Sequence, residues 1–213
     1  MPFRLTTAFT LPNQLTILRI ILTPFFVYSL FVHTTGYYIA AFVFFTVAAI
    51  TDWYDGYFAR KYNTFTDFGK FLDPLADKIL VLSTFVSFYV LGMIKLWMVL
   101  VIATRDLVIT LLRMSRMNTN APFVTSKFAK WKTASQMTAI FIVLAFLILK
   151  QHALTTNNLY DIYSALENIS MIAVLMNLVT FITAFSGLHY MIRNRRHVKD
   201  IANAFCRVFL PSM

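Results

Sequence analysis

The sequence predicts an all-α integral membrane protein, with six transmembrane helices preceded by an N-terminal interfacial amphipathic helix. Composition is the first reason: 59% of the 213 residues are hydrophobic and 13% are charged, whereas a soluble domain carries about 25% charged residues. The second is the length of the apolar runs, because a bilayer-crossing helix needs roughly 20 mostly apolar residues. These runs argue against the alternative, a soluble protein with a large core. The expected spans are 18–33, 37–59, 73–93, 96–116, 133–150 and 168–192.

The chain is expected to form one domain over residues 1–213, with an interfacial segment at 1–17 and a basic cytoplasmic tail at 193–213. The stretch "LPNQLTILR" can lie in the membrane interface before the first span, and Pro12 suits the first turn of a helix.

Basic residues are divided unequally between the two sides of the expected bundle. If both termini lie on one side, only Lys95 and Lys150 fall on the other, and Arg105 lies inside a span. Because Lys and Arg mark the cytoplasmic side, we expect the chain to lie in the cell inner membrane with both termini on the cytoplasmic side. The active site is expected on the same side. The net charge of +10 is then a basic face against anionic headgroups, and no nucleic acid is expected as a partner.

Four carboxylates lie where the second span ends and the third begins. Asp52 and Asp55 are three residues apart, and Asp73 and Asp77 are four apart, so each pair projects from one helical face. The short connection predicts antiparallel neighbours and one cluster of four acids. A divalent cation would offset their repulsion, and oxygen ligands favour Mg²⁺ or Mn²⁺. The alternative is a set of salt bridges to Arg60, Lys61, Lys70 and Lys78.

Small residues and an arginine stand between the two aspartate pairs. Gly56, Ala59 and Gly69 allow a ligand or a neighbouring helix to approach closely, and helix packing alone would also explain Gly56. The planar fork of Arg60 matches phosphate oxygens. Together with a metal site, these residues favour a phosphate-bearing substrate and metal-assisted displacement at phosphorus.

The full spacing is D-x2-D-G-x2-A-R-x8-G-x3-D-x3-D over residues 52–77, and it resembles the signature of the CDP-alcohol phosphatidyltransferases. The resemblance implies that the four aspartates hold two metal ions on the pyrophosphate of CDP-diacylglycerol. It implies that Asp77 is also the catalytic base that takes the acceptor hydroxyl proton, and that the enzyme is a homodimer. The residues that it places around CDP-diacylglycerol are Asn13, Thr16, Gly56, Ala59, Arg60, Thr66 and Gly69.

Within this family, three stretches resemble the branch that uses glycerol 3-phosphate as the acceptor and forms phosphatidylglycerol phosphate and CMP. They are "LPNQLTILRIILTPFF", "LDPLADKIL", and "RDLVITLLR" followed by "SKFAKWKTASQ". Ala129 departs from the branch, which usually has a glycine before the lysine. Another acceptor such as inositol phosphate stays open. A divalent-cation transporter is a further alternative, but it would need acids spread across the bilayer rather than clustered on one side.

Glycerol 3-phosphate is a small dianion, so its site needs cations. Arg105 lies inside the fourth span, and Arg113 follows eight residues later on roughly the same face. Since an arginine inside a span is costly without a partner, its alternative role is a structural ion pair with Asp106 or with a site carboxylate. The residues expected to bind the acceptor are Arg105, Arg113, Lys130, Lys132 and Thr133.

Overall fold

The computed structural model describes residues 11–62, 67–117, 127–156, 159–193 and 195, and within these ranges the regular structure is entirely helical. The all-α prediction is therefore confirmed for the described part of the chain. The helices are α1 (Leu11–Phe31), α2 (Thr35–Tyr62), α3 (Asp67–Val90), α4 (Leu96–Met117), α5 (Lys127–Thr156), α6 (Tyr160–Asn168) and α7 (Met171–Arg193).

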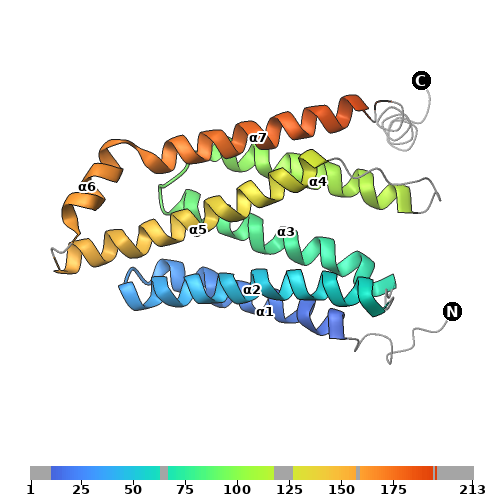
Figure 1. Ribbon diagram of the computed structural model, residues 1–213, viewed down its shortest axis with the longest axis horizontal. Helices are drawn as coiled ribbons and strands as arrows, with labels where there is room; N and C mark the ends of the chain where they lie inside the picture. Colours follow the sequence, from blue (N-terminus) through green and yellow to red (C-terminus); the bar gives the residue numbers. More distant parts are fainter. Residues whose placement is uncertain (1–10, 63–66, 118–126, 157–158, 194, 196–213) are drawn as a thin grey trace, which may run out of the picture.

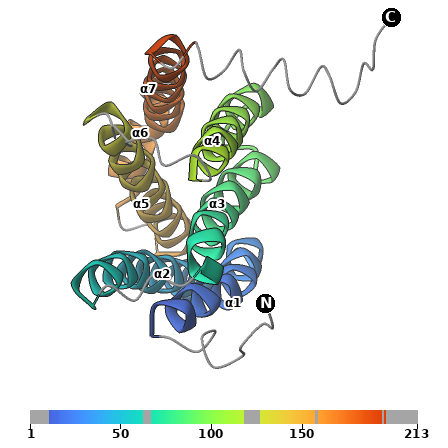
Figure 2. The ribbon, with the colours of Figure 1, turned by 90° about the vertical axis from the view of Figure 1, so that its right-hand side faces the viewer.

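The long helices run along one axis and alternate in direction, as Figure 1 shows. The start of α1, the end of α2, the start of α3 and the ends of α4 and α7 lie at one end of the bundle, whereas α6 lies at the other. Helix α1 packs against α2 and α3, α5 packs against α2 and α7, and α4 packs against α3 and α7. The view along the bundle in Figure 2 shows α7 farthest from α1 and α2.

A glycine-based cap turns the chain back between α3 and α4. Gly92 has a φ of 73°, a left-handed conformation that glycine adopts without a steric penalty. The amide of Gly92 donates to the Tyr89 carbonyl over 2.9 Å, and the amide of Met93 donates to the Phe88 carbonyl over 3.0 Å. This pair of bonds is a Schellman motif, which ends the helix and lets α4 start within a few residues.

Aromatic side chains join three helices in the core. The Phe45 ring of α2 lies 5.6 Å from the Phe26 ring of α1 and 5.2 Å from the Phe141 ring of α5, between centroids. Large apolar side chains also cover much of the outer surface, among them Tyr28 and Phe181, which are 64% and 72% exposed. Such extensive apolar exposure suits a surface that faces lipid.

The chain is an integral membrane protein, and four of its described helical segments are long and apolar enough to cross a bilayer. These are Gln14–Phe31, Thr35–Asp52, Trp131–Thr156 and Met171–Arg193. Helices α3 and α4 coincide with the other two expected spans, for which crossing the membrane stays a prediction.

Two features differ from the expectation. Residues 11–17 do not form a helix of their own but continue into the first span within α1. The interfacial position expected for this segment stays a prediction, and its residues 1–10 lie outside the described ranges. No glycine or proline between residues 13 and 23 breaks the helix there. Helix α6 was not expected in the connection after the fifth span. Its Tyr163 is buried against α5, with the Tyr163 and Phe146 ring centroids 5.7 Å apart.

Candidate active site

The aspartate motif lies on the two helices that meet at one end of the bundle. Asp52 and Asp55 are on α2, and Asp73 and Asp77 are on α3. Side-chain positions are described for Asp52 and Asp77, so the convergence of all four carboxylates stays a prediction. Among the expected donor-binding residues, Thr66 lies outside the described ranges, and only the helix positions, not the side chains, are described for Asn13, Gly56, Ala59, Arg60 and Gly69.

Asp52 is tied to the first helix by a buried arginine. Arg19 Nη1 lies 2.7 Å from Asp52 Oδ1, and the Arg19 side chain is fully buried whereas that of Asp52 is 42% exposed. Thr16, three residues before Arg19 on α1, is also fully buried. Helix α1 therefore brings a buried polar side chain into contact with Asp52, whereas a role of Thr16 in binding the donor stays a prediction.

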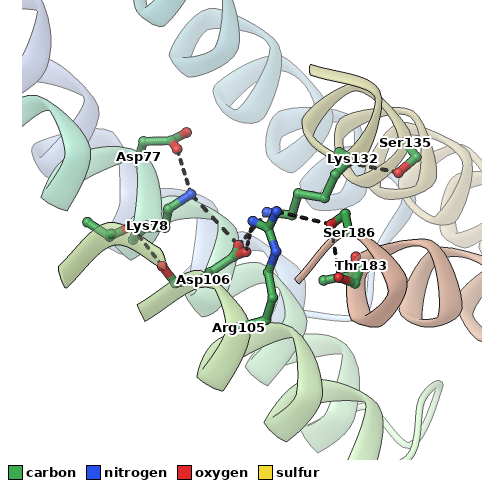
Figure 3. A network of polar contacts seen from close by, with 9 residues as sticks. Asp77, Lys78, Arg105, Asp106, Lys132, Ser135, Thr183 and Ser186 are labelled. Carbon is green, nitrogen blue, oxygen red and sulfur yellow. Dashed lines mark hydrogen bonds and ion pairs between the residues drawn. The ribbon is translucent and has the colours of Figure 1, made fainter. Parts of the chain in front are cut away.

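A chain of charges leads from Asp77 into the bundle, as Figure 3 shows. Lys78 Nζ lies 3.1 Å from Asp77 Oδ2 and 3.7 Å from Asp106 Oδ2. The ion pair between Lys78 and Asp77 is one of the salt bridges expected under the alternative to a metal site. The lysine also connects the motif on α3 with α4.

Asp106 is the centre of this network. Its side chain is almost completely buried, and it accepts a hydrogen bond from Lys132 Nζ of α5 over 2.6 Å through Oδ2. Arg105 Nη1 donates to Asp106 Oδ1 over 3.0 Å. A buried carboxylate needs such charged partners, because an isolated charge in an apolar interior is very costly.

The last helix completes the network. Arg105 Nη2 donates to Ser186 Oγ of α7 over 3.0 Å, and Ser186 Oγ donates to the Thr183 carbonyl over 2.9 Å. Figure 3 shows Arg105 of α4 and Lys132 of α5 meeting at Asp106, with Arg105 also reaching Ser186. Four helices, α3, α4, α5 and α7, therefore contribute to one polar cluster.

The cluster carries more positive than negative charge. Lys78, Arg105 and Lys132 supply three cations, and Asp77 and Asp106 supply two carboxylates. These five groups leave one net positive charge, and the excess grows if a metal ion occupies Asp77. Such a cluster can accept a small anion through charge-assisted hydrogen bonds.

The structure brings Arg105 and Lys132 together, as expected of an acceptor site, and the bond between Arg105 and Asp106 matches the structural alternative as well. Thr133 lies exposed on α5 beside Lys132. Arg113 lies on α4 and Lys130 on α5, with side chains outside the described set. The sequence pointed to Asp106 as a partner of Arg105 but held no signal for the contact with Ser186.

The expected metal site consists of oxygen ligands on α2 and α3. Within the residues that the structure describes, no group of three His, Cys, Asp or Glu side chains could hold a metal ion. Side-chain positions are described for two of the four expected ligands, Asp52 and Asp77, and both present carboxylate oxygens at partly exposed positions. Hard oxygen donors of this kind fit Mg²⁺ or Mn²⁺.

Comparison with known proteins supplies an independent line of evidence. Residues 9–185 match the family model of the CDP-alcohol phosphatidyltransferases. A protein of Bacillus subtilis (strain 168) named CDP-diacylglycerol–glycerol-3-phosphate 3-phosphatidyltransferase is 30% identical over 203 residues, which cover 90% of this chain and 98% of the relative. A protein of the same name from Escherichia coli (strain K12) is 40% identical over 137 residues, or 62% of this chain and 75% of the relative.

Proposed function

We propose that this chain, which belongs to the CDP-alcohol phosphatidyltransferase family, transfers the phosphatidyl group of CDP-diacylglycerol to glycerol 3-phosphate. The products are phosphatidylglycerol phosphate and CMP, so the enzyme is a phosphatidylglycerophosphate synthase. The names of the two relatives support both substrates. The structural observation that carries the proposal is the cationic cluster around buried Asp106, next to Asp77 of the aspartate motif.

Arg105 and Lys132 hold the phosphate of the acceptor, joined by Arg113, Lys130 and Thr133. Their support is the convergence of the two described cations at one buried carboxylate. A phosphate dianion that enters this cluster meets donors already held in place by Asp106, so little conformational entropy is lost on binding. An acceptor without a phosphate group, such as serine, would leave the excess positive charge of this cluster unmatched by an anion.

The donor lies against the aspartate motif, between the bilayer and the cytoplasm. Asp52, Asp55, Asp73 and Asp77 would hold the divalent metal ions that members of this family generally use, and we propose two ions of Mg²⁺ or Mn²⁺. Metal ions held there would supply positive charge that offsets the charge of the pyrophosphate and of the CMP leaving group. The CDP moiety is bordered by Asn13, Thr16, Gly56, Ala59, Arg60, Thr66 and Gly69.

Asp77 takes the proton from the acceptor hydroxyl. Asp77 belongs to the aspartate motif, and Lys78 connects it with the cationic cluster. Lys78 Nζ lies 3.1 Å from Asp77 Oδ2. The deprotonated oxygen then attacks the β-phosphorus, the phosphorus that carries the diacylglycerol, and the bond to CMP breaks.

The site faces the cytoplasm from the cell inner membrane, and the active enzyme is a homodimer. Support for the orientation comes from the charge distribution of the sequence and from the arrangement of helix ends, since the start of α1 and the end of α7 lie at the same end of the bundle as the α2 and α3 ends that carry the motif (Figure 1). Lipid donor can then enter from the bilayer while the soluble acceptor arrives from the cytoplasm.

An acceptor panel tests this proposal. Purified protein, CDP-diacylglycerol and Mg²⁺ are incubated separately with radiolabelled glycerol 3-phosphate, inositol phosphate and serine, and lipid-soluble label is measured. We expect label from glycerol 3-phosphate and background from serine. Preferential incorporation of inositol phosphate would contradict the choice of acceptor, and no incorporation from any of the three would contradict the proposed reaction.

A further inference from the structure

We infer that Ser186 and Gly187 of α7 are positioning residues that fix the guanidinium of Arg105 and thereby set the affinity of the site for the acceptor phosphate. This inference rests on the proposed function. It concerns a part of the chain beyond the aspartate motif, and the family match ends at residue 185, just before these two positions.

Ser186 holds the outer edge of the guanidinium. Its hydroxyl donates its single proton to the Thr183 carbonyl over 2.9 Å, within α7. The oxygen lone pairs are therefore left to accept the bond from Arg105 Nη2 over 3.0 Å. Ser186 is only 5% exposed, so water has little access to replace the hydroxyl.

Gly187 leaves the room through which the Arg105 side chain passes. A β-carbon at this position would lie 2.7 Å from Arg105 Cγ and 3.7 Å from its Cβ and Nε. Real β-carbons essentially never approach another atom to 2.7 Å, so either the arginine or the helix must shift. Because Cγ lies near the root of the side chain, a rotation that moves it also carries the guanidinium away.

Ser186 and Gly187 both constrain the side chain of Arg105, whose guanidinium is proposed to bind the acceptor phosphate. Arg105 Nη1 binds Asp106 Oδ1 over 3.0 Å, and the other oxygen of Asp106 binds Lys132. The guanidinium is thus held on one side by α7 and on the other by its own helix. Since the planar fork binds phosphate only in a narrow range of orientations, a displaced guanidinium should bind glycerol 3-phosphate more weakly.

The test is steady-state kinetics of Gly187→Ala and Ser186→Ala with both substrates varied. We expect the acceptor KM to rise about tenfold in each, near the lower end of the loss for one charge-assisted hydrogen bond. The donor KM and kcat should change by less than about threefold. The matched control is Gly36→Ala, because a β-carbon at Gly36 meets nothing within 4 Å. Ser186→Thr keeps the hydroxyl and should restore most of the acceptor affinity.

A double mutant separates positioning from a general structural effect. If Gly187 acts through Arg105, Gly187→Ala should not raise the acceptor KM further in an Arg105→Ala background, because effects that share one route are not additive. An additive rise would overturn the inference. If Gly187→Ala does not fold, the Ser186→Ala and Ser186→Thr pair decides alone.

Two other results would also overturn the inference: an unchanged acceptor KM in both single variants, or equal losses for donor and acceptor. Its failure can be told apart from that of the proposed function. A wild-type protein that forms no lipid from glycerol 3-phosphate contradicts both. Normal wild-type activity that depends on Arg105, but is insensitive to Gly187→Ala and Ser186→Ala, contradicts this inference alone.

Discussion

Lys132 of α5 and Asp106 of α4 form a buried ion pair, with 2.6 Å between Nζ and Oδ2. The same carboxylate also lies within ion-pair distance of Arg105 and Lys78. Asp106 therefore offsets part of the charge of three cations, which are Arg105 on its own helix, Lys78 on α3 and Lys132 on α5. Asp106 keeps those cations inside the bundle, where they can meet an anion.

Replacement of Asp106 should destabilise the fold. Asp106→Asn keeps the size of the side chain but removes the negative charge, so that buried Lys132 loses its counter-charge. Breaking a buried pair in this way costs about 3–5 kcal/mol. We expect a clear fall in the thermal unfolding midpoint in detergent. Asp161→Asn is the control, because Asp161 is exposed at the start of α6. Equal midpoints for Asp106→Asn and wild type would show that the network does not stabilise the bundle.

Chelation of divalent metal should abolish the activity. The expected ligands are four carboxylates, and their mutual repulsion is relieved by a doubly charged ion. We predict loss of transfer activity in EDTA and recovery on addition of excess Mg²⁺ or Mn²⁺, with monovalent salt as the control for ionic strength. Full activity in thoroughly chelated protein would rule out the metal site.

Asp77→Asn should distinguish a catalytic base from a residue that only binds metal. The amide keeps the size and one acceptor oxygen of Asp77 but cannot take the proton. We expect kcat to fall by at least about a hundredfold, in the range of general-base removal, while part of the donor affinity remains. In Asp52→Asn, metal and donor binding should weaken together. Turnover of Asp77→Asn near the wild-type rate would refute the assignment of the base.

Hydropathy predicted the bounds of α4 closely, because nearly the whole helix lies within one apolar run. The fourth span was expected at 96–116, and α4 runs from Leu96 to Met117. The fifth helix extends beyond the expected span at both ends, from Lys127 to Thr156, whereas α3 both begins and ends earlier than expected, at Asp67 and Val90. Apolar runs define the part of a helix that can lie in lipid, whereas the helix itself can continue through polar residues at either end.

The sequence singled out the charged residues of the cluster and named Asp106 as a possible partner of Arg105, but it did not predict the contacts between distant helices. Spacing placed Asp52 and Asp77 on their helices, and an arginine inside an apolar run pointed to Arg105. The contacts between Arg19 and Asp52 and between Arg105 and Ser186 depend on how the helices rotate and pack against one another. Arg105 and Ser186 are 81 residues apart in the chain, and no local pattern encodes a contact at that separation.

The central claim is that the cationic cluster around Asp106 binds the phosphate of glycerol 3-phosphate. The direct measurement is the KM of both substrates in Arg105→Ala, Lys130→Ala and Lys132→Ala. The matched control is Lys95→Ala, because Lys95 is exposed in the connection between the end of α3 and the start of α4. Loss of one charged hydrogen bond should raise the acceptor KM roughly 10- to 150-fold and leave the donor KM nearly unchanged. An acceptor KM that stays at the wild-type value in all three variants would contradict the claim.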